Sequence, residues 1–139
     1  MTKTSLQQQT TVHALPSKVW KVLTHPTYVN QHLLDDGSII SDWTEGSSIQ
    51  KTEDAVGTRQ LVSVGDVLEA VPGMLLKFSF REGNTSTYIV TTYELIVAGE
   101  GEELKMKCEG FSATQSEYLI RVQQANLLLK KIKWLAEYS

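Results

Sequence analysis

Cysteine is almost absent from this sequence. Its 139 residues include one cysteine, Cys108, so an intramolecular disulfide is impossible. Long apolar runs are missing as well, since no stretch approaches the ~18 consecutive apolar residues of a membrane-spanning helix. The N-terminal segment also has no apolar core of the kind that marks a secretory signal. We therefore expect a reduced, cytoplasmic protein that does not span a membrane.

Positive charge is in short supply too. The 13 Lys and Arg residues and 16 Asp and Glu residues give a net charge of −3, which argues against nucleic-acid binding, because that function needs a concentrated positive field. Apolar residues make up 41% of the chain and charged residues 21%, which are ordinary values for a globular protein. We expect a single domain over residues 1–139, long enough to bury its own core.

Recognisable catalytic motifs are also absent. The chain contains no G-x-S-x-G, H-E-x-x-H, C-x-x-C or P-loop. Three polar residues near a predicted helix end, His32, Asp35 and Asp36, could bind a metal in principle, but such residues more often cap and solvate a helix. Cys108 lies on the inward face of a predicted strand, where a thiol usually behaves as a small hydrophobe and not as a nucleophile. We expect no metal, no cofactor and no catalytic apparatus.

Two short helices are predicted near the start of the chain. A strand is predicted over 4–13, and Pro16 after it suits the first turn of a helix. Apolar residues then recur at helical spacing up to Leu23. Pro26 ends this helix, because proline lacks an N–H and disfavours helical geometry at the residue before it. A second short helix is predicted to run to about Leu33.

Alternating apolar and polar residues dominate the middle of the chain and predict strands. Turn signals separate the strands, and the clearest is Pro72-Gly73. Gly65 is expected to mark a bulge, while 53–58 and 98–103 are expected to form a loop and a turn. The predicted strands cover 38–42, 48–51, 59–70, 76–81, 87–97 and 104–109.

From about Thr114 to Glu137 the apolar period becomes helical, which predicts a helix roughly 36 Å long. Because the strands follow one another without intervening helices, we expect an antiparallel sheet and the α+β class. The inner face of the sheet is the surface large enough to cover the helix. The residues expected on the covered face are Tyr118, Val122, Ala125, Leu128, Leu129, Ile132 and Leu135. The residues expected on a solvated basic side are Lys130, Lys131 and Lys133.

Several strings in this order resemble the SRPBCC (START-like, helix-grip) superfamily, and within it the branch of the C-terminal domain of the Hsp90 ATPase activator. The strings are PSKVWKVLTHP (16–26), SDW (41–43) with Gly46, GDVLE (65–69), YEL (93–95), EGF (109–111) and LLLKKIK (127–133). The chain has Cys108 where this family often has a histidine. It has Tyr118 where the family often has a tryptophan early in the long helix.

The resemblance implies a curved antiparallel sheet of about six or seven strands wrapped around the long C-terminal helix. The pair of short helices would plug one open end of the sheet. Such folds commonly leave a pocket for an apolar molecule between sheet and helix, so residues of the inner faces become candidates for its wall. These candidates are Trp43, Phe78, Phe80, Thr91, Tyr93, Met106, Cys108, Tyr118, Val122 and Leu129.

One tryptophan and two arginines have alternative roles in relation to such a pocket. Trp43 could either close the edge of the core or stack on a ligand at the pocket mouth. Arg59 and Arg81 could fix the polar end of a ligand, although an isolated strand arginine is more often solvated or paired at the surface. These alternatives stay open at the level of sequence.

Three functions are compatible with this fold. The leading one is binding of a small apolar molecule, lipid-like or aromatic, in the central cavity. A cyclase- or dehydratase-type enzyme would need an ionisable pair in the same cavity, where the inward faces offer Tyr93 and Cys108 but no clear carboxylate. A protein-interaction module, such as a co-chaperone domain, would instead have a filled core and an exposed apolar patch. A homodimer or another protein partner is left open.

Overall fold

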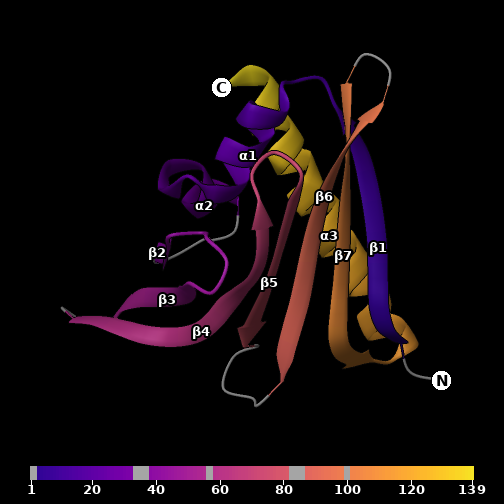
Figure 1. Ribbon diagram of the computed structural model, residues 1–139. Coiled ribbons are helices and arrows are strands. Elements are labelled where there is room, and N and C mark those ends of the chain that lie inside the picture. Colours follow the sequence, from indigo (N-terminus) through magenta and orange to yellow (C-terminus); the bar gives the residue numbers. More distant parts are fainter. Residues whose placement is uncertain (1–2, 33–37, 56–57, 82–86, 99–100) are drawn as a thin grey trace.

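The computed structural model describes residues 3–32, 38–55, 58–81, 87–98 and 101–139 (Figure 1). Within these ranges the expected order is confirmed: a strand, a helix pair, six further strands and one long helix. The elements are β1 (Lys3–Val12), α1 (Pro16–Thr24), α2 (Pro26–His32), β2 (Ser38–Ser41), β3 (Ser48–Ala55), β4 (Thr58–Val71), β5 (Leu75–Arg81), β6 (Tyr88–Ala98), β7 (Gly101–Ala113) and α3 (Gln115–Tyr138).

The strands form one seven-stranded antiparallel sheet in the order β1-β7-β6-β5-β4-β3-β2. Strands β2 to β7 each pair with their neighbours in sequence, whereas β1 pairs with β7 and places Leu6 opposite Cys108. The sheet curves around α3, which lies against its concave side (Figure 1). This α+β helix-grip architecture confirms the expected fold class.

Two segments that the sequence predicted as a loop and a turn are largely strand. β3 ends at Ala55 and β4 begins at Thr58, so most of the segment 53–58 is strand and not loop. Glu102 and Glu103 belong to β7 and not to a turn, because they pair with β1 and β6 on either side. Ladder pairing outweighs the poor β-propensity of these acidic residues. Residues 56–57 and 99–100 lie outside the described residues.

Gly65 does not mark a bulge. The register between β4 and β5 shifts between Val67 and Glu69 instead. Gly65 has another role, because a Cβ atom there would lie 2.0 Å from the backbone oxygen of Ser79. Only glycine permits so close an approach of β4 to β5.

The helix pair is built around His25 and Pro26. The backbone N–H of His25 bonds to the Lys21 oxygen at the end of α1, and Nδ1 of His25 accepts a hydrogen bond from the N–H of Thr27 in α2, at 3.3 Å. His25 therefore serves the end of one helix and the start of the next. The two helices lie at one end of the curved sheet, beside the C-terminal end of α3 (Figure 1), as expected.

Helix α3 begins with a capping box. Thr114 Oγ1 accepts a hydrogen bond from the N–H of Glu117, at 3.4 Å, and Glu117 Oε1 accepts one from the N–H of Thr114, at 3.0 Å. In the described part of the chain, none of the helices is long and apolar enough to cross a membrane. The face of α3 buried in the core consists of Ala125, Leu129, Ile132, Leu135 and Ala136.

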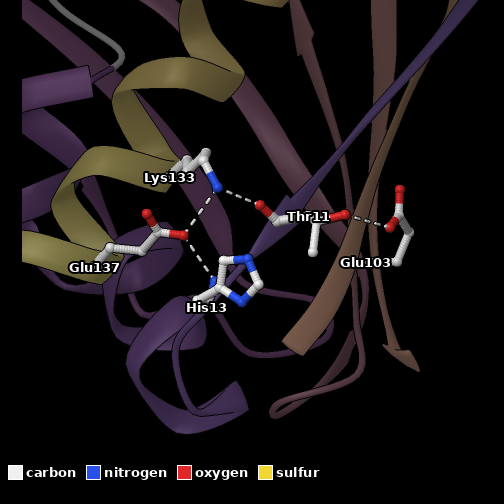
Figure 2. Close-up of polar contacts among 5 residues, drawn as sticks. All are labelled: Thr11, His13, Glu103, Lys133 and Glu137. Carbon is white, nitrogen blue, oxygen red and sulfur yellow. Dashed lines mark hydrogen bonds and ion pairs between the residues drawn. The ribbon is translucent and has the colours of Figure 1, made fainter. Parts of the chain in front are cut away.

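A polar cluster joins the last turns of α3 to β1 and its neighbour β7 (Figure 2). Glu137 Oε2 accepts hydrogen bonds from the backbone N–H of His13, at 2.7 Å, and from Lys133 Nζ, at 2.9 Å. Lys133 Nζ also donates to the backbone oxygen of Thr11, at 2.5 Å, while the Thr11 hydroxyl donates to Glu103, at 3.0 Å. Lys133 is therefore not part of a purely solvated basic face as the sequence suggested.

Candidate functional site

A cavity of about 180 Å³ lies between the concave face of the sheet and α3. Sheet residues contribute most of its wall, and Leu128 contributes from α3. The residues that line it are Ile39, Trp43, Ile49, Lys51, Phe78, Phe80, Thr91, Tyr93, Met106 and Leu128.

Six of the ten residues proposed from the sequence meet at this cavity. These six are Trp43, Phe78, Phe80, Thr91, Tyr93 and Met106. The other four do not line it: Leu129 is buried in the core, Cys108 and Tyr118 pack half-buried against the core, and Val122 is half-buried. Leu128 takes the place of Leu129 at the cavity, because one residue along a helix turns the side chain by about 100°.

Three lining residues besides Leu128 were not among those proposed from the sequence. Ile49 and Lys51 share the inward face of β3, and Ile39 lies on β2. The alternation of Ile49 and Lys51 is the signal that could have identified both. Of the two arginines considered for a ligand, Arg81 at the end of β5 is not among the lining residues, and the side chain of Arg59 lies outside the described residues.

Aromatic rings form a continuous section of the wall. Trp43 and Phe78 meet edge to face, with ring centroids 5.6 Å apart and an interplanar angle of 79°. Phe78 and Tyr93 follow, with centroids 6.2 Å apart. Trp43 is only 7% exposed, so it both closes the core edge and lines the cavity.

Trp43 holds an uncommon backbone conformation. Its φ of 54° lies in the left-handed region, which costs a non-glycine residue roughly 1–2 kcal/mol. Two features offset this cost: Ser41 Oγ accepts a hydrogen bond from the Trp43 N–H, at 3.1 Å, and the Gly46 N–H bonds to the Val67 oxygen, at 2.9 Å. The bend at residues 43–46 thereby directs the indole inward, towards Phe78.

Tyr93 presents a hydroxyl without a hydrogen-bond partner among the described residues. Its side chain is 2% exposed. Burial, reinforced by the nearby Cys108, raises the pKa of Tyr93 well above its usual value, so the phenol stays protonated. An unpaired buried hydroxyl costs about 1–3 kcal/mol. A residue of the cavity wall therefore carries a buried polar atom that is unsatisfied among the described residues.

Cys108 lies beside this wall but lacks the properties of a nucleophile. Its Sγ is 3.8 Å from Thr91 Oγ1. Burial raises the pKa of Cys108, despite the opposing influence of Thr91 and Arg121, so the thiol is protonated at neutral pH. Among the described residues, no cluster of three His, Cys, Asp or Glu side chains could hold a metal ion. Asp35 and Asp36 lie outside those residues.

A larger hollow, of about 960 Å³, lies outside the core between α1 and the turn at Pro72–Met74. Its walls include Trp20 from α1 and the strongly exposed side chains of Met74 and Val97. It opens broadly to solvent. The smaller cavity is the better candidate site, because aromatic rings converge there and its lining residue Tyr93 has a buried hydroxyl that is unpaired among the described residues.

The sequence of this chain matches a family model over residues 13–137, and the family is described as activator of Hsp90 ATPase homolog 1-like protein. The chain belongs to this family. The match of the Hsp90-activator-like family to nearly the whole chain confirms the resemblance seen in the local strings. No curated protein is significantly similar to it in sequence.

Solved structures show how widely the fold of this Hsp90-activator-like protein is shared. A protein from Cytophaga hutchinsonii is 23% identical with a TM-score of 0.79, covering 96% of this chain and 94% of that one. A protein from Chromobacterium violaceum is 18% identical with a TM-score of 0.74, covering 99% and 100%. Ara h 8.0201 is 12% identical with a TM-score of 0.70, covering 96% of each chain. These likenesses concern the fold alone.

Proposed function

We propose that this protein binds a compact apolar molecule that carries one hydrogen-bonding group, in the cavity under α3. The observation that carries the proposal is the Tyr93 hydroxyl, which is buried without a partner among the described residues and belongs to a residue that lines the cavity. Buried polar groups are normally satisfied, so an unsatisfied one beside a cavity needs an explanation. A ligand atom that pairs with the hydroxyl supplies it.

The size of the cavity favours a ligand of one or two aromatic rings. Its volume of about 180 Å³ is below the ~300–1,000 Å³ of pockets that hold drug-sized molecules. It is close to the ~150 Å³ at which an apolar protein cavity holds benzene. A long acyl chain would extend beyond this volume, so an aromatic ligand is favoured over a lipid.

The chemistry of the wall favours a flat ring. Trp43, Phe78 and Tyr93 offer ring faces and edges, which pack against an aromatic ligand in offset or edge-to-face geometry. Burial of the ring would supply most of the binding free energy, about 25 cal/mol per Å² of apolar surface before the costs of association. The hydroxyl of Tyr93 would supply selectivity between analogues of equal size.

The same wall supports binding better than acid–base catalysis. Lys51 and Tyr93 are its ionisable groups among the described lining residues, which include no carboxylate. The raised pKa of Tyr93 keeps this side chain protonated, so it is suited to hydrogen bonding and not to proton abstraction. A cyclase-type activity would need a base that the described lining residues do not supply in an obvious form.

The test compares 2-naphthol with naphthalene, which differ by one hydroxyl. We expect the wild-type protein to bind 2-naphthol several-fold more tightly, because a neutral hydrogen bond contributes about 1 kcal/mol. Tyr93→Phe should remove this preference while naphthalene affinity stays within about twofold. The matched control is Tyr88→Phe on the same strand, because Tyr88 is exposed and should leave both affinities unchanged.

Two results would contradict the proposal. One is equal binding of both compounds by the wild type and the Tyr93→Phe variant, which would remove any role of the hydroxyl. The other is failure of both compounds to bind. Solvent extraction of freshly purified protein, followed by mass spectrometry, would complement the test: a stoichiometric aromatic compound with a polar group would support the proposal and identify its class.

A further inference from the structure

Helix α3 carries apolar side chains on two opposite faces. One face is buried against the sheet. On the other, Ile120, Leu127 and Trp134 are 54%, 60% and 59% exposed, and Tyr138 extends the same line to the end of the helix. Exposed residues on a helix are normally polar, so this apolar stripe is unexpected for a surface in contact with water.

The spacing of the stripe is that of a helix–helix contact. Ile120, Leu127 and Trp134 are seven residues apart, so they drift by only about 20° per step around the helix. Leu127 lies on the side opposite the buried Ala125 and Ala136, since positions two and nine residues away point about 160–180° around the helix. A seam that repeats every seven residues stays on one side of a helix, so a second helix can pack along it.

We propose that two copies of this chain associate through the outer faces of α3, antiparallel and with the twofold axis at Leu127. A twofold contact must be self-complementary, because each residue meets its counterpart across the axis. In this arrangement Leu127 meets Leu127 of the second copy. Ile120 of one copy then meets Trp134 of the other, and the reverse contact repeats on the far side of the axis.

The charges on this face favour the antiparallel arrangement. Lys130 and Lys131 flank the seam, and an axis at Leu127 places them opposite Gln124 and Gln123 of the second copy. Amide oxygens can accept hydrogen bonds from ammonium groups. In a parallel arrangement the same lysines would face their own counterparts, and like charges facing one another are unfavourable. The charge pattern therefore favours the antiparallel direction over the parallel one.

The shape of the face agrees with this pairing. A hollow of about 390 Å³ lies along α3 and is lined by Leu127, Lys130, Lys131, Trp134 and Leu135. It lies where the antiparallel arrangement places Ile120 of the second copy. Because of the twofold axis, Ile120 of each copy enters the hollow of the other copy. This is the knob-into-hole relation of packed helices.

The area available suits a weak, reversible dimer. From the exposed fractions of Ile120, Leu127, Trp134 and Tyr138, the two copies together would bury about 1,000 Å², near the lower limit for a specific interface. We therefore expect a dissociation constant in the micromolar range. The cavity lies on the other side of α3, so association and ligand binding can be tested separately.

Sedimentation equilibrium from low micromolar to submillimolar protein tests the dimer. Leu127→Glu places two carboxylates at the axis and should weaken association at least tenfold. The matched control is Leu119→Glu on the same helix, 53% exposed and about 80° around from the seam, which should leave association unchanged. Circular dichroism melts would verify that both variants are folded.

A cysteine at the axis tests the geometry. In a Cys108→Ser background, Leu127→Cys should form a disulfide-linked dimer with copper phenanthroline and oxygen as oxidant, because only a residue at the axis meets itself. Leu119→Cys should not. A wild type that stays monomeric at submillimolar concentration would overturn the proposal. So would a dimer that Leu127→Glu leaves intact, since that dimer would use another face.

Discussion

The indole of Trp43 meets the ring of Phe78 edge to face, with centroids 5.6 Å apart. The contact joins the bend before β3 to the middle of β5 and closes one side of the cavity. Edge-to-face pairs contribute about 0.5–1.5 kcal/mol beyond their buried area. The backbone of Trp43 is strained, so this residue combines a structural cost with a role in the cavity wall.

Replacing Trp43 tests how much the protein depends on that contact. We expect Trp43→Ala to lower the free energy of unfolding by about 3–5 kcal/mol, as for other large buried aromatics. Trp134→Ala is the control, because Trp134 is exposed in a single copy and its loss should cost less than about 0.5 kcal/mol. Urea denaturation at low micromolar concentration measures both. Equal losses would show that the Trp43–Phe78 contact is energetically unimportant.

Tyr93→Phe should stabilise the empty protein. The change removes a buried hydroxyl that has no partner among the described residues, so the free energy of unfolding should rise by about 1 kcal/mol or more. Thermal denaturation of ligand-free protein is the measurement, with Tyr88→Phe as the exposed control. A loss of stability on removal of the Tyr93 hydroxyl would mean that this group is already satisfied.

Gly65→Ala should be among the most damaging small substitutions. The added methyl group would meet the backbone oxygen of Ser79, and because that atom belongs to a paired strand it cannot move aside. We expect a loss of at least about 2–3 kcal/mol. Gly46→Ala is the comparison, since its Cβ meets nothing within 4 Å but its φ is +86°; we expect about 1 kcal/mol there. Chemical denaturation measures the free energy of unfolding of both variants and so compares the steric effect at Gly65 with the conformational effect at Gly46.

Glu137 should make stability depend on acid pH. Its hydrogen bond from the His13 backbone, followed by that from Lys133, lowers the pKa of Glu137 from the usual 4.5. The unfolded chain therefore takes up a proton more readily, so the stabilisation is fully present above about pH 4.5 and is lost as the pH falls towards the folded pKa. Glu137→Gln should flatten this dependence between about pH 3 and 6.

Glu117 limits how far Glu137→Gln can flatten the pH dependence of stability. Its pKa is also lowered, by the side-chain and backbone hydrogen bonds of Thr114, so it contributes a dependence of the same sign. The Glu137→Gln variant should therefore retain part of the wild-type slope, and a double variant with Glu117→Gln should retain less. An unchanged slope in Glu137→Gln would show that the contact with His13 does not persist in solution.

Local patterns were sufficient to predict most of the fold. Pro16 and Pro26 mark the first residues of the two short helices, and the alternation around Phe78 predicts β5 with its inward face. The limits of strands at acidic segments were not predicted, because Glu102 and Glu103 become strand residues through pairing with β6 and with β1, which is distant in the sequence. The bulge expected at Gly65 shows the same limit. Glycine is required at this position because β5 approaches closely, which the local sequence does not reveal.

The cavity wall was predicted in part for a related reason. Inward-facing strand residues such as Tyr93 follow from period two, but the rotation of α3 about its own axis does not follow from its sequence. The helix is apolar on two faces, so the choice between Leu128 and Leu129 at the cavity depends on tertiary packing. The unpaired state of the Tyr93 hydroxyl likewise depends on the positions of all its neighbours.

The pairing of β1 with β7 has a consequence for biosynthesis. Leu6 lies opposite Cys108, so β1 leaves the ribosome long before the strand with which it pairs. Contacts between such distant segments slow folding, and an unpaired strand edge favours association with other chains. The polar run Gln7-Gln8-Gln9-Thr10-Thr11 in β1 reduces this risk, because it keeps the nascent segment hydrated until the sheet closes.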